Sequence, residues 1–273
     1  MSRIEARFRS LKEQGRTALI PYIVAGDPHP DVTVDLLHSL AAAGADIIEI
    51  GVPFSDPMSE GPVIQLAHER ALEHRVSLKQ VLGMVREFRL RDADTPLLLM
   101  GYANPLEHMG HAAFVDAASA AGVDGVLTVD IPPEEVAHLN TELKRAGMDN
   151  IFLVAPTTPD ARVARIAAQA SGFIYYVSLK GVTGAGHIDT EDVASHVAGI
   201  RRHCGLPVVV GFGIKDAQSA ARVAAIADGV VVGSALVASV AAAVKAGKPN
   251  DEACAAAANL LADIRRGIDN VAS

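Results

Sequence analysis

Residues 46–62 read DIIEIGVPFSDPMSEGP, a short apolar run that passes directly into a turn-rich loop. The run has the β-branched content of a buried strand, whereas Pro, Gly, Ser and Asp dominate the loop. Apolar residues spaced three and four apart flank this stretch at residues 32–43 and 63–72, which predicts helices there. A strand, a loop and a helix in this order form the unit of a parallel sheet, because parallel strands need crossover connections.

The same unit recurs along the chain. Eight strands are predicted, at residues 18–24, 46–50, 97–100, 125–129, 151–154, 173–177, 208–210 and 229–232. Helices are predicted at residues 4–14, 32–43, 63–72, 78–90, 111–121, 134–146, 161–170, 190–202, 217–227 and 250–266. The strands are nearly continuous apolar runs, which is typical of a sheet covered on both faces.

Eight strand–helix units in a chain of 273 residues indicate a (β/α)8 TIM barrel of the α/β class. The helix at the N-terminus is an addition to that fold, and so is an extra helix between the second and third strands. No linker rich in Pro, Gly or Ser divides the chain, so residues 1–273 are expected to form a single domain. A doubly wound open sheet is the alternative, and the strand count favours the barrel.

Charge and composition narrow the class of function. The formal net charge of −8 argues against nucleic acid and acidic membrane surfaces as partners. Cys204 and Cys254 form no spaced pattern, which indicates free thiols in a reducing compartment. No signal peptide is visible, and the longest uncharged stretch, residues 229–244, is shorter than the roughly 20 residues that a membrane span needs. We therefore expect a cytoplasmic protein.

The unusual polar residues follow the predicted strands, where a barrel builds its active face. Glu49 lies at the end of the second strand, and burying a glutamate in an apolar run is costly unless the acid is used. The loop that follows brings Asp56 and Glu60. Two acids delivered by one strand and its loop suggest proton-transfer chemistry. A carboxylate paired inside the barrel, without a catalytic role, is the structural alternative for Glu49.

Glycines follow the last two strands, in Gly211-Phe212-Gly213 and in Gly233-Ser234. Loops at these positions of a barrel often bind a phosphate through backbone N–H groups, and glycine lets the backbone approach the oxygens closely. A pair of tight turns would use the same residues. The position after strands seven and eight favours the phosphate interpretation.

The segment after the sixth strand, residues 180–187, carries Lys180 and three glycines. Its glycine density suggests a loop that closes over a ligand, with an ordinary surface loop as the alternative. Lys180 offers a second chemistry, since a desolvated lysine at a strand end can form a Schiff base with a carbonyl substrate. His108 and His111 are three residues apart without an accompanying metal-binding motif, so no metal site is expected.

Together these features resemble the tryptophan synthase alpha subunit family over essentially the whole chain. The most specific matches are residues 49–57, EIGVPFSDP, and Gly61-Pro62. Further matches are residues 102–105 (YANP), 130–132 (DIP), 181–184 (GVTG), 211–214 (GFGI) and 233–234 (GS). The resemblance implies a lyase of L-tryptophan biosynthesis. Such a lyase cleaves indole-3-glycerol phosphate by a retro-aldol reaction to indole and glyceraldehyde 3-phosphate.

The resemblance also implies partners and residue roles. The alpha chain would need no cofactor or metal, while a beta subunit carrying pyridoxal phosphate would receive the indole within an α2β2 heterotetramer. Glu49 would carry the proton transfers, and Glu60 would support the indole N–H. Substrate binding would fall to Tyr22, Met100, Tyr102, Leu127, Tyr175, Thr183, Gly184, Phe212, Gly213, Gly233 and Ser234, and contact with the beta subunit to Asp56, Pro57 and Pro132.

Glu60 departs from the family pattern, which usually has aspartate at this place. A misplacement of about 1 Å can cost on the order of 100-fold in rate, so the longer side chain matters. We expect Glu60→Asp to keep or raise turnover, and a large loss would mean that the site is built around glutamate. Two alternatives stay open: a stand-alone indole-releasing lyase, and a catalytically weakened subunit that only activates its partner.

Overall fold

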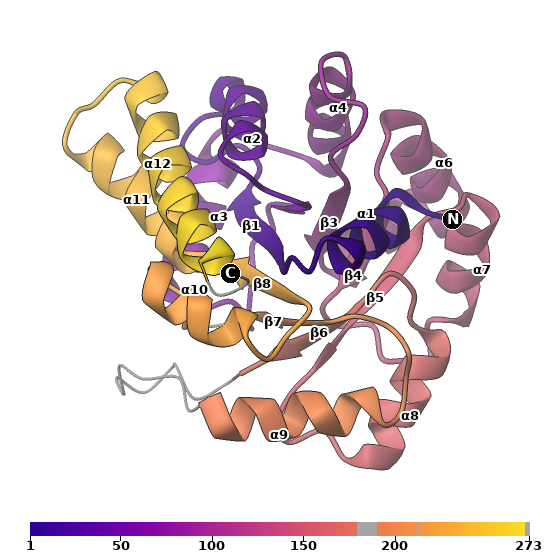
Figure 1. Ribbon diagram of the computed structural model, residues 1–273. Helices are drawn as coiled ribbons and strands as arrows, with labels where there is room; N and C mark the ends of the chain where they lie inside the picture. The colour runs from indigo at the N-terminus through magenta and orange to yellow at the C-terminus, as the bar shows by residue number, and fades with distance from the viewer. Residues whose placement is uncertain (179–189, 212, 271–273) are drawn as a thin grey trace.

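The computed structural model describes residues 1–178, 190–211 and 213–270 of the chain (Figure 1). Within these residues eight parallel strands close into a barrel in sequence order, and the last strand pairs with the first. The closed barrel confirms the predicted fold and excludes the open sheet. The strands are β1 (Ala18–Val24), β2 (Ile48–Gly51), β3 (Leu97–Gly101), β4 (Gly125–Thr128), β5 (Asp149–Val154), β6 (Ile174–Val177), β7 (Val208–Gly211) and β8 (Gly229–Val232).

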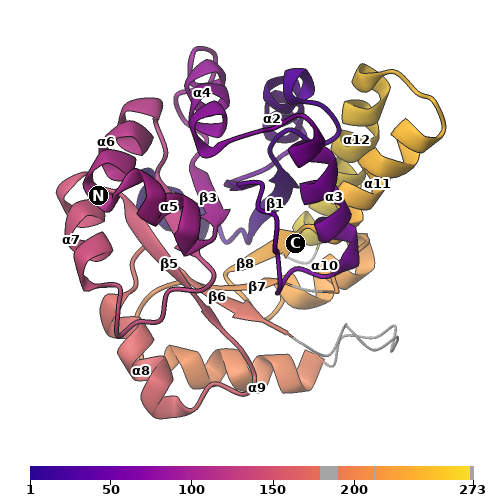
Figure 2. The ribbon, with the colours of Figure 1, turned by 180° about the vertical axis from the view of Figure 1, so that it is seen from behind.

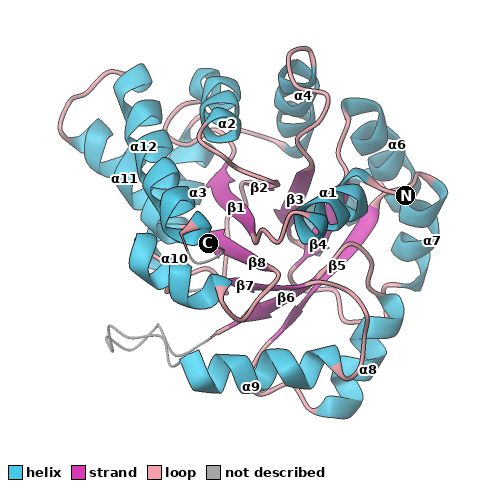
Figure 3. Cartoon of the chain, in the orientation of Figure 1, coloured by secondary structure: helices cyan, strands magenta, loops and turns pink. Residues whose placement is uncertain are grey.

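Helices surround the strands, as the front and rear views show (Figures 1 and 2) and as the colouring by element makes clear (Figure 3). None of the helices in the described part of the chain is long and apolar enough to cross a bilayer. They are α1 (Arg3–Glu13), η1 (Pro30–Val32), α2 (Thr33–Ala42), α3 (Pro62–Glu73), α4 (Leu78–Arg89), α5 (Ala103–Met109), α6 (His111–Ala121), α7 (Ala137–Arg145), α8 (Asp160–Gln169), α9 (Thr190–Arg201), α10 (Ala217–Ala224), α11 (Ser234–Lys245) and α12 (Asn250–Asp269).

Both predicted additions to the barrel are present, since α1 precedes β1 and both α3 and α4 lie between β2 and β3. The sequence pattern misses α5 and α11, and it begins α7 three residues too early. Residues 132–135 form a turn instead, closed by a hydrogen bond of 3.0 Å that the Glu135 N–H donates to the Pro132 carbonyl oxygen. Proline is compatible with a first helical turn, so the sequence pattern alone could not show that these residues close a turn instead.

Side chains alternate between two apolar clusters along each strand, one inside the barrel and one between the strands and the helices. In β1, Tyr22 belongs to the inner cluster and Ile23 to the outer one. In β2, Ile48 and Ile50 belong to the outer cluster. Glu49, between them, therefore points into the barrel.

The helix α1 closes the N-terminal end of the barrel and lies in front of the strands in Figure 1. Its buried residues Ile4, Phe8 and Leu11 join the inner apolar cluster. The ring of Phe8 lies 5.6 Å from the ring of Phe173, centroid to centroid. This packing fills the N-terminal end of the barrel. A ligand therefore has to enter from the opposite end, at the C-terminal ends of the strands.

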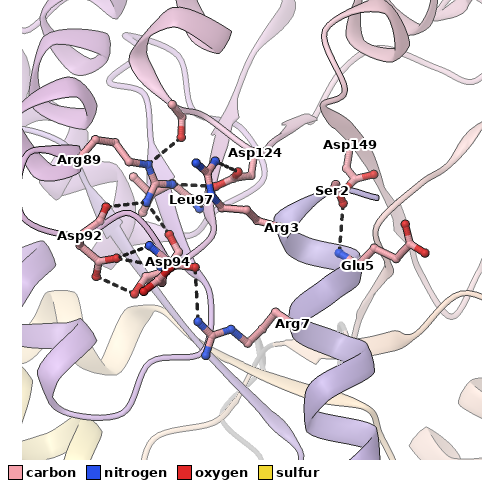
Figure 4. A network of polar contacts seen from close by, with 12 residues as sticks. Ser2, Arg3, Glu5, Arg7, Arg89, Asp92, Asp94, Leu97, Asp124 and Asp149 are labelled. Atoms are coloured by element: carbon pink, nitrogen blue, oxygen red, sulfur yellow. Dashed lines mark hydrogen bonds and ion pairs between the residues drawn. The ribbon is translucent and has the colours of Figure 1, made fainter.

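Three aspartates, each just before a strand in the sequence, stabilise the same N-terminal end of the barrel. Each carboxylate accepts a hydrogen bond from a backbone N–H near the start of the preceding strand and contacts an arginine. In Figure 4, Arg3 and Arg89 each donate to Asp124 over 2.7 Å. The backbone bonds join Asp46 to Leu19 (2.9 Å), Asp124 to Leu97 (2.8 Å) and Asp228 to Val208 (2.8 Å). Such an arrangement at the N-terminal face of a barrel serves stability.

Candidate active site

A cavity of about 510 Å³ lies at the C-terminal ends of the strands, within the usual range of roughly 300–1,000 Å³ for ligand pockets. Much of its lining is apolar, with Ile64, Leu153, Val177 and Val231 among the contributing side chains. The cavity therefore suits a ligand with a flat or apolar part. Seven of the residues expected to bind or transform a substrate line it: Tyr22, Glu60, Met100, Tyr175, Gly213, Gly233 and Ser234.

Glu49 is 1% exposed, and neither of its carboxyl oxygens has a hydrogen-bond partner among the described residues. Burial, with a smaller contribution from the nearby charge of Glu60, raises the pKa of Glu49 from 4.5 to about 8. Near neutral pH the group therefore holds a proton that it can give up and take back. A buried carboxyl group with a pKa close to the working pH is suited to general acid–base catalysis.

Glu49 lies beside the cavity, although it is not part of the lining itself. Its register partner across β1 and β2 is Tyr22, which does line the cavity. A second lining residue, Tyr175, is also close to Glu49. Its pKa is raised well above 10, first by burial and then by the charge of Glu49. The Tyr175 hydroxyl therefore stays protonated and available as a donor.

Glu60 ends the loop after β2, and its buried carboxylate is held through one oxygen. Oε2 lies 2.6 Å from Nε2 of His68 and accepts a longer hydrogen bond of 3.4 Å from the Tyr22 hydroxyl. Both of these contacts fall on Oε2, and the Tyr102 hydroxyl lies close enough to interact with the same carboxylate. Oε1, which contacts neither His68 nor Tyr22, can accept a hydrogen bond from a ligand.

One part of the cavity is suited to an anion. The helix α11 begins at Ser234 with Gly233 at its N-cap, so its unpaired N–H groups and the positive end of its dipole lie at the lining. Gly213 has φ of +75°, a left-handed conformation that favours glycine. Lys215 lines the same cavity and adds a cation that the motif analysis missed.

Two residues expected to bind substrate are not part of this lining. Tyr102 stacks its ring on Phe54, with 4.7 Å between the ring centroids, and its hydroxyl lies 3.3 Å from Oγ of Ser59. It therefore supports the loop that carries Glu60. Leu127 belongs to the inner apolar cluster and lines a separate cavity of about 10 Å³. Thr183, Gly184 and Phe212, and Lys180 of the aldolase alternative, lie outside the described residues.

The residues expected to contact a partner differ in exposure. Asp56 is exposed, Pro57 is buried and Pro132 is half-buried. Met58, beside Pro57, is 82% exposed. In the described part of the chain, no group of three or more His, Cys, Asp or Glu residues could hold a metal ion.

Motif analysis also missed His68, which contacts Glu60. The sequence does hold a signal for it, because His68 shares the buried face of α3 with Ile64, Ala67 and Ala71. A histidine placed among apolar residues at helical spacing must find a polar partner inside the protein.

An eight-stranded barrel with two buried acids beside one apolar cavity defines a (β/α)8-barrel protein built for acid–base chemistry on a small ligand. The sequence identifies the family. The model of the family described as tryptophan synthase alpha chain matches residues 8–265. The chain therefore belongs to the tryptophan synthase alpha chain family.

Individual relatives agree with this assignment. The chain is 64% identical over 237 residues to the tryptophan synthase alpha chain of Thioalkalivibrio sulfidiphilus, covering 87% of this chain and 89% of that protein. It is 58% identical to the alpha chain of Thiobacillus denitrificans over 98% and 97% of the two chains. The crystal structure of tryptophan synthase subunit alpha from Legionella pneumophila superimposes with a TM-score of 0.92 at 43% identity, covering 99% of each chain.

Proposed function

We propose that this protein is the lyase component of a tryptophan synthase, cleaving indole-3-glycerol phosphate to indole and glyceraldehyde 3-phosphate. Membership of the tryptophan synthase alpha chain family supports this reaction. The comparisons give no support to a stand-alone lyase or to a catalytically weakened, partner-activating subunit. The observation that carries the chemistry is Glu49, a buried and unpartnered carboxyl group with a pKa of about 8.

The reaction breaks the carbon–carbon bond between the indole ring and the glycerol phosphate chain. The ring carbon at this bond must gain a proton, and the hydroxyl group on the adjacent chain carbon must lose one as it becomes the aldehyde. The electron pair of the broken bond returns to the ring. Protonated Glu49 can supply the first proton, and the carboxylate that results can accept the second, so the residue ends the cycle unchanged.

Protonation of the ring carbon places positive charge on the ring, and this charge is delocalised onto the indole nitrogen. Oε1 of Glu60, which contacts neither His68 nor Tyr22, is the acceptor we assign to the indole N–H. A carboxylate held in place before the reaction stabilises this developing charge without having to reorganise. His68 and Tyr22 hold the other oxygen and so keep the group in place.

The two ends of the substrate match the two kinds of lining. The indole ring would lie among Met100, Leu153 and Tyr175, which are apolar or aromatic. The phosphate would bind at Gly213, Gly233 and Ser234 with the N-terminus of α11, and Lys215 would add its charge.

The family name points to a synthase of more than one chain, and we assign this protein a beta-subunit partner that carries pyridoxal phosphate, in an α2β2 assembly. The alpha chain itself would use no cofactor, would form a single domain over residues 1–273 and would work in the cytoplasm. Asp56, Pro57 and Pro132 would contact the beta subunit. Met58 lies beside Pro57 on the same loop and is exposed, so it is available for the same contact.

Indole release from indole-3-glycerol phosphate, measured with and without a beta subunit, tests the proposal. Release of indole together with glyceraldehyde 3-phosphate is expected, and faster release with the beta subunit. The Schiff-base alternative would instead leave substrate attached to the protein after borohydride treatment. Absence of indole in both conditions would refute the lyase activity.

A further inference from the structure

One histidine holds both ends of the loop that carries the second acid. His68 lies on α3 with its side chain 1% exposed. The backbone N–H of Phe54, at the start of the loop, donates a hydrogen bond of 3.1 Å to Nδ1 of His68. The other ring nitrogen, Nε2, lies 2.6 Å from Oε2 of Glu60, at the end of the loop. The imidazole therefore bridges residues 54 and 60.

These contacts define the protonation of the ring. Nδ1 accepts from a backbone N–H and so carries no proton, which leaves the proton on Nε2. Nε2–H then donates to Oε2 of Glu60. The Tyr22 hydroxyl donates to the same oxygen, so both hydrogen bonds hold the carboxylate through Oε2.

The length of the Glu60 side chain is part of this arrangement. The carboxylate reaches His68 at a short hydrogen-bond distance. An aspartate at residue 60 would draw the carboxylate back by about one carbon–carbon bond and lose the contact, unless the loop moved. The contact thus favours the opposite outcome to the one expected from the family resemblance, namely that Glu60→Asp lowers turnover.

We propose that His68 is a positioning residue that clamps the loop at Phe54 and Glu60, and that Glu60 and His68 work as a matched pair. The proposal rests on the function proposed above for Glu60. It explains how this chain places a longer acid where the family usually has aspartate. The unusual glutamate is then a working part of the site.

Two amide variants separate the two hydrogen bonds of His68. The amide of Asn reaches the place of Nδ1, so His68→Asn keeps an acceptor for Phe54 but loses the donor to Glu60. The amide of Gln reaches the place of Nε2, so His68→Gln keeps that donor. We expect His68→Asn to lower kcat for indole release on the order of 10- to 100-fold, with KM little changed, because a misplaced group loses that much rate. His68→Gln should recover most of the rate.

A purely structural role would not produce this pattern. It would lower the melting temperature of both variants and leave kcat of the folded protein near that of the wild type. That result would overturn the proposal. His38→Asn is a matched control, since His38 is a half-buried helical histidine that stacks on Phe88 at 4.6 Å, away from the cavity. It should leave kcat unchanged.

A double-mutant cycle tests the pairing. Glu60→Asp and His68→Asn should each lower kcat, and the double variant should be no slower than the slower single variant, because both changes remove the same contact. Losses that simply multiply would contradict a matched pair.

Nuclear magnetic resonance of the histidine ring nitrogens separates this inference from the proposed reaction, because it needs no turnover. The wild-type protein should show His68 protonated at Nε2, with a proton signal shifted downfield by the short hydrogen bond. The signal should be lost in Glu60→Asp. A ring protonated at Nδ1, or an unchanged signal in Glu60→Asp, would refute the pairing even if the wild type releases indole.

Discussion

Glu49 and Tyr22 face each other across the pairing of β2 with β1, and both side chains point into the barrel. Burial raises the pKa of both groups, that of Glu49 to about 8 and that of Tyr22 well above 10, and the charge of Glu60 adds to each shift. The two paired strands thus hold the protonated carboxyl group of Glu49 beside the neutral phenol of Tyr22. Glu60, held by His68, has the different task of accepting a hydrogen bond.

The raised pKa of Glu49 predicts how stability depends on pH. Between about pH 5 and 8 the folded protein holds a proton that the unfolded chain has released, so rising pH favours unfolding. Glu49→Gln removes this proton linkage. The stability of the variant relative to wild type should therefore grow with pH across this window, by up to about 1.4 kcal/mol per unit. Denaturant unfolding at several pH values measures the difference, and a constant difference would contradict the raised pKa.

Gly51 makes room for Tyr22. A Cβ at Gly51 would lie 2.8 Å from Cζ of Tyr22 and closer still to its hydroxyl oxygen, so the phenol would have to move. Overpacking of this kind typically costs about 1–3 kcal/mol, and Gly51→Ala should lower both the melting temperature and kcat. Adding Tyr22→Phe should restore part of the lost stability. If the melting temperature of Gly51→Ala equals that of the wild type, the site repacks without cost, which would contradict this prediction.

Lys215 should bind the substrate anion without taking part in the chemistry. Lys215→Met is expected to raise KM several-fold and leave kcat unchanged, because it removes binding that ground state and transition state share. Lys79→Met, at an exposed position of α4, serves as the control. A fall in kcat with unchanged KM would place Lys215 in the reaction itself.

The N-terminal end of the barrel should contribute stability and not activity. Asp124→Ala removes the acceptor for the Leu97 N–H and leaves the guanidinium of Arg89 without its carboxylate, at a cost of about 3–5 kcal/mol. Asp35→Ala breaks an exposed ion pair with Arg91 and should cost less than about 1 kcal/mol. Thermal unfolding compares the two. Equal effects would mean that the buried network contributes little.

Much of the fold could be predicted because buried strands and amphipathic helices have different periods. The pattern misses α11, whose sequence is almost entirely Ala, Val and Ser and so lacks a polar face to set the period. It misses α5 because the residues around Pro105 have the composition of a turn, although proline is tolerated in a first helical turn. Local composition was ambiguous in both segments, and packing against the barrel decided the outcome.

The candidate site was harder to predict than the fold. Residues at strand ends, such as Glu49 and Gly233, could be placed on the active face because barrel topology brings those ends together. His68 and Lys215 carry no motif, and their positions depend on how a helix and a loop pack. Tyr102 shows the converse case, since it follows a strand but turns toward Phe54 and Ser59. Side-chain direction is set by neighbours that the sequence does not reveal.

The turnover of Glu49→Gln tests the central claim most directly. Glutamine keeps the shape of the protonated acid but cannot exchange a proton, so indole release should fall by about 100- to 10,000-fold, the usual worth of a general acid–base group. Calorimetric binding of indole-3-glycerol phosphate should remain measurable. Turnover close to that of the wild type, with substrate bound normally, would contradict a proton-transfer role for Glu49.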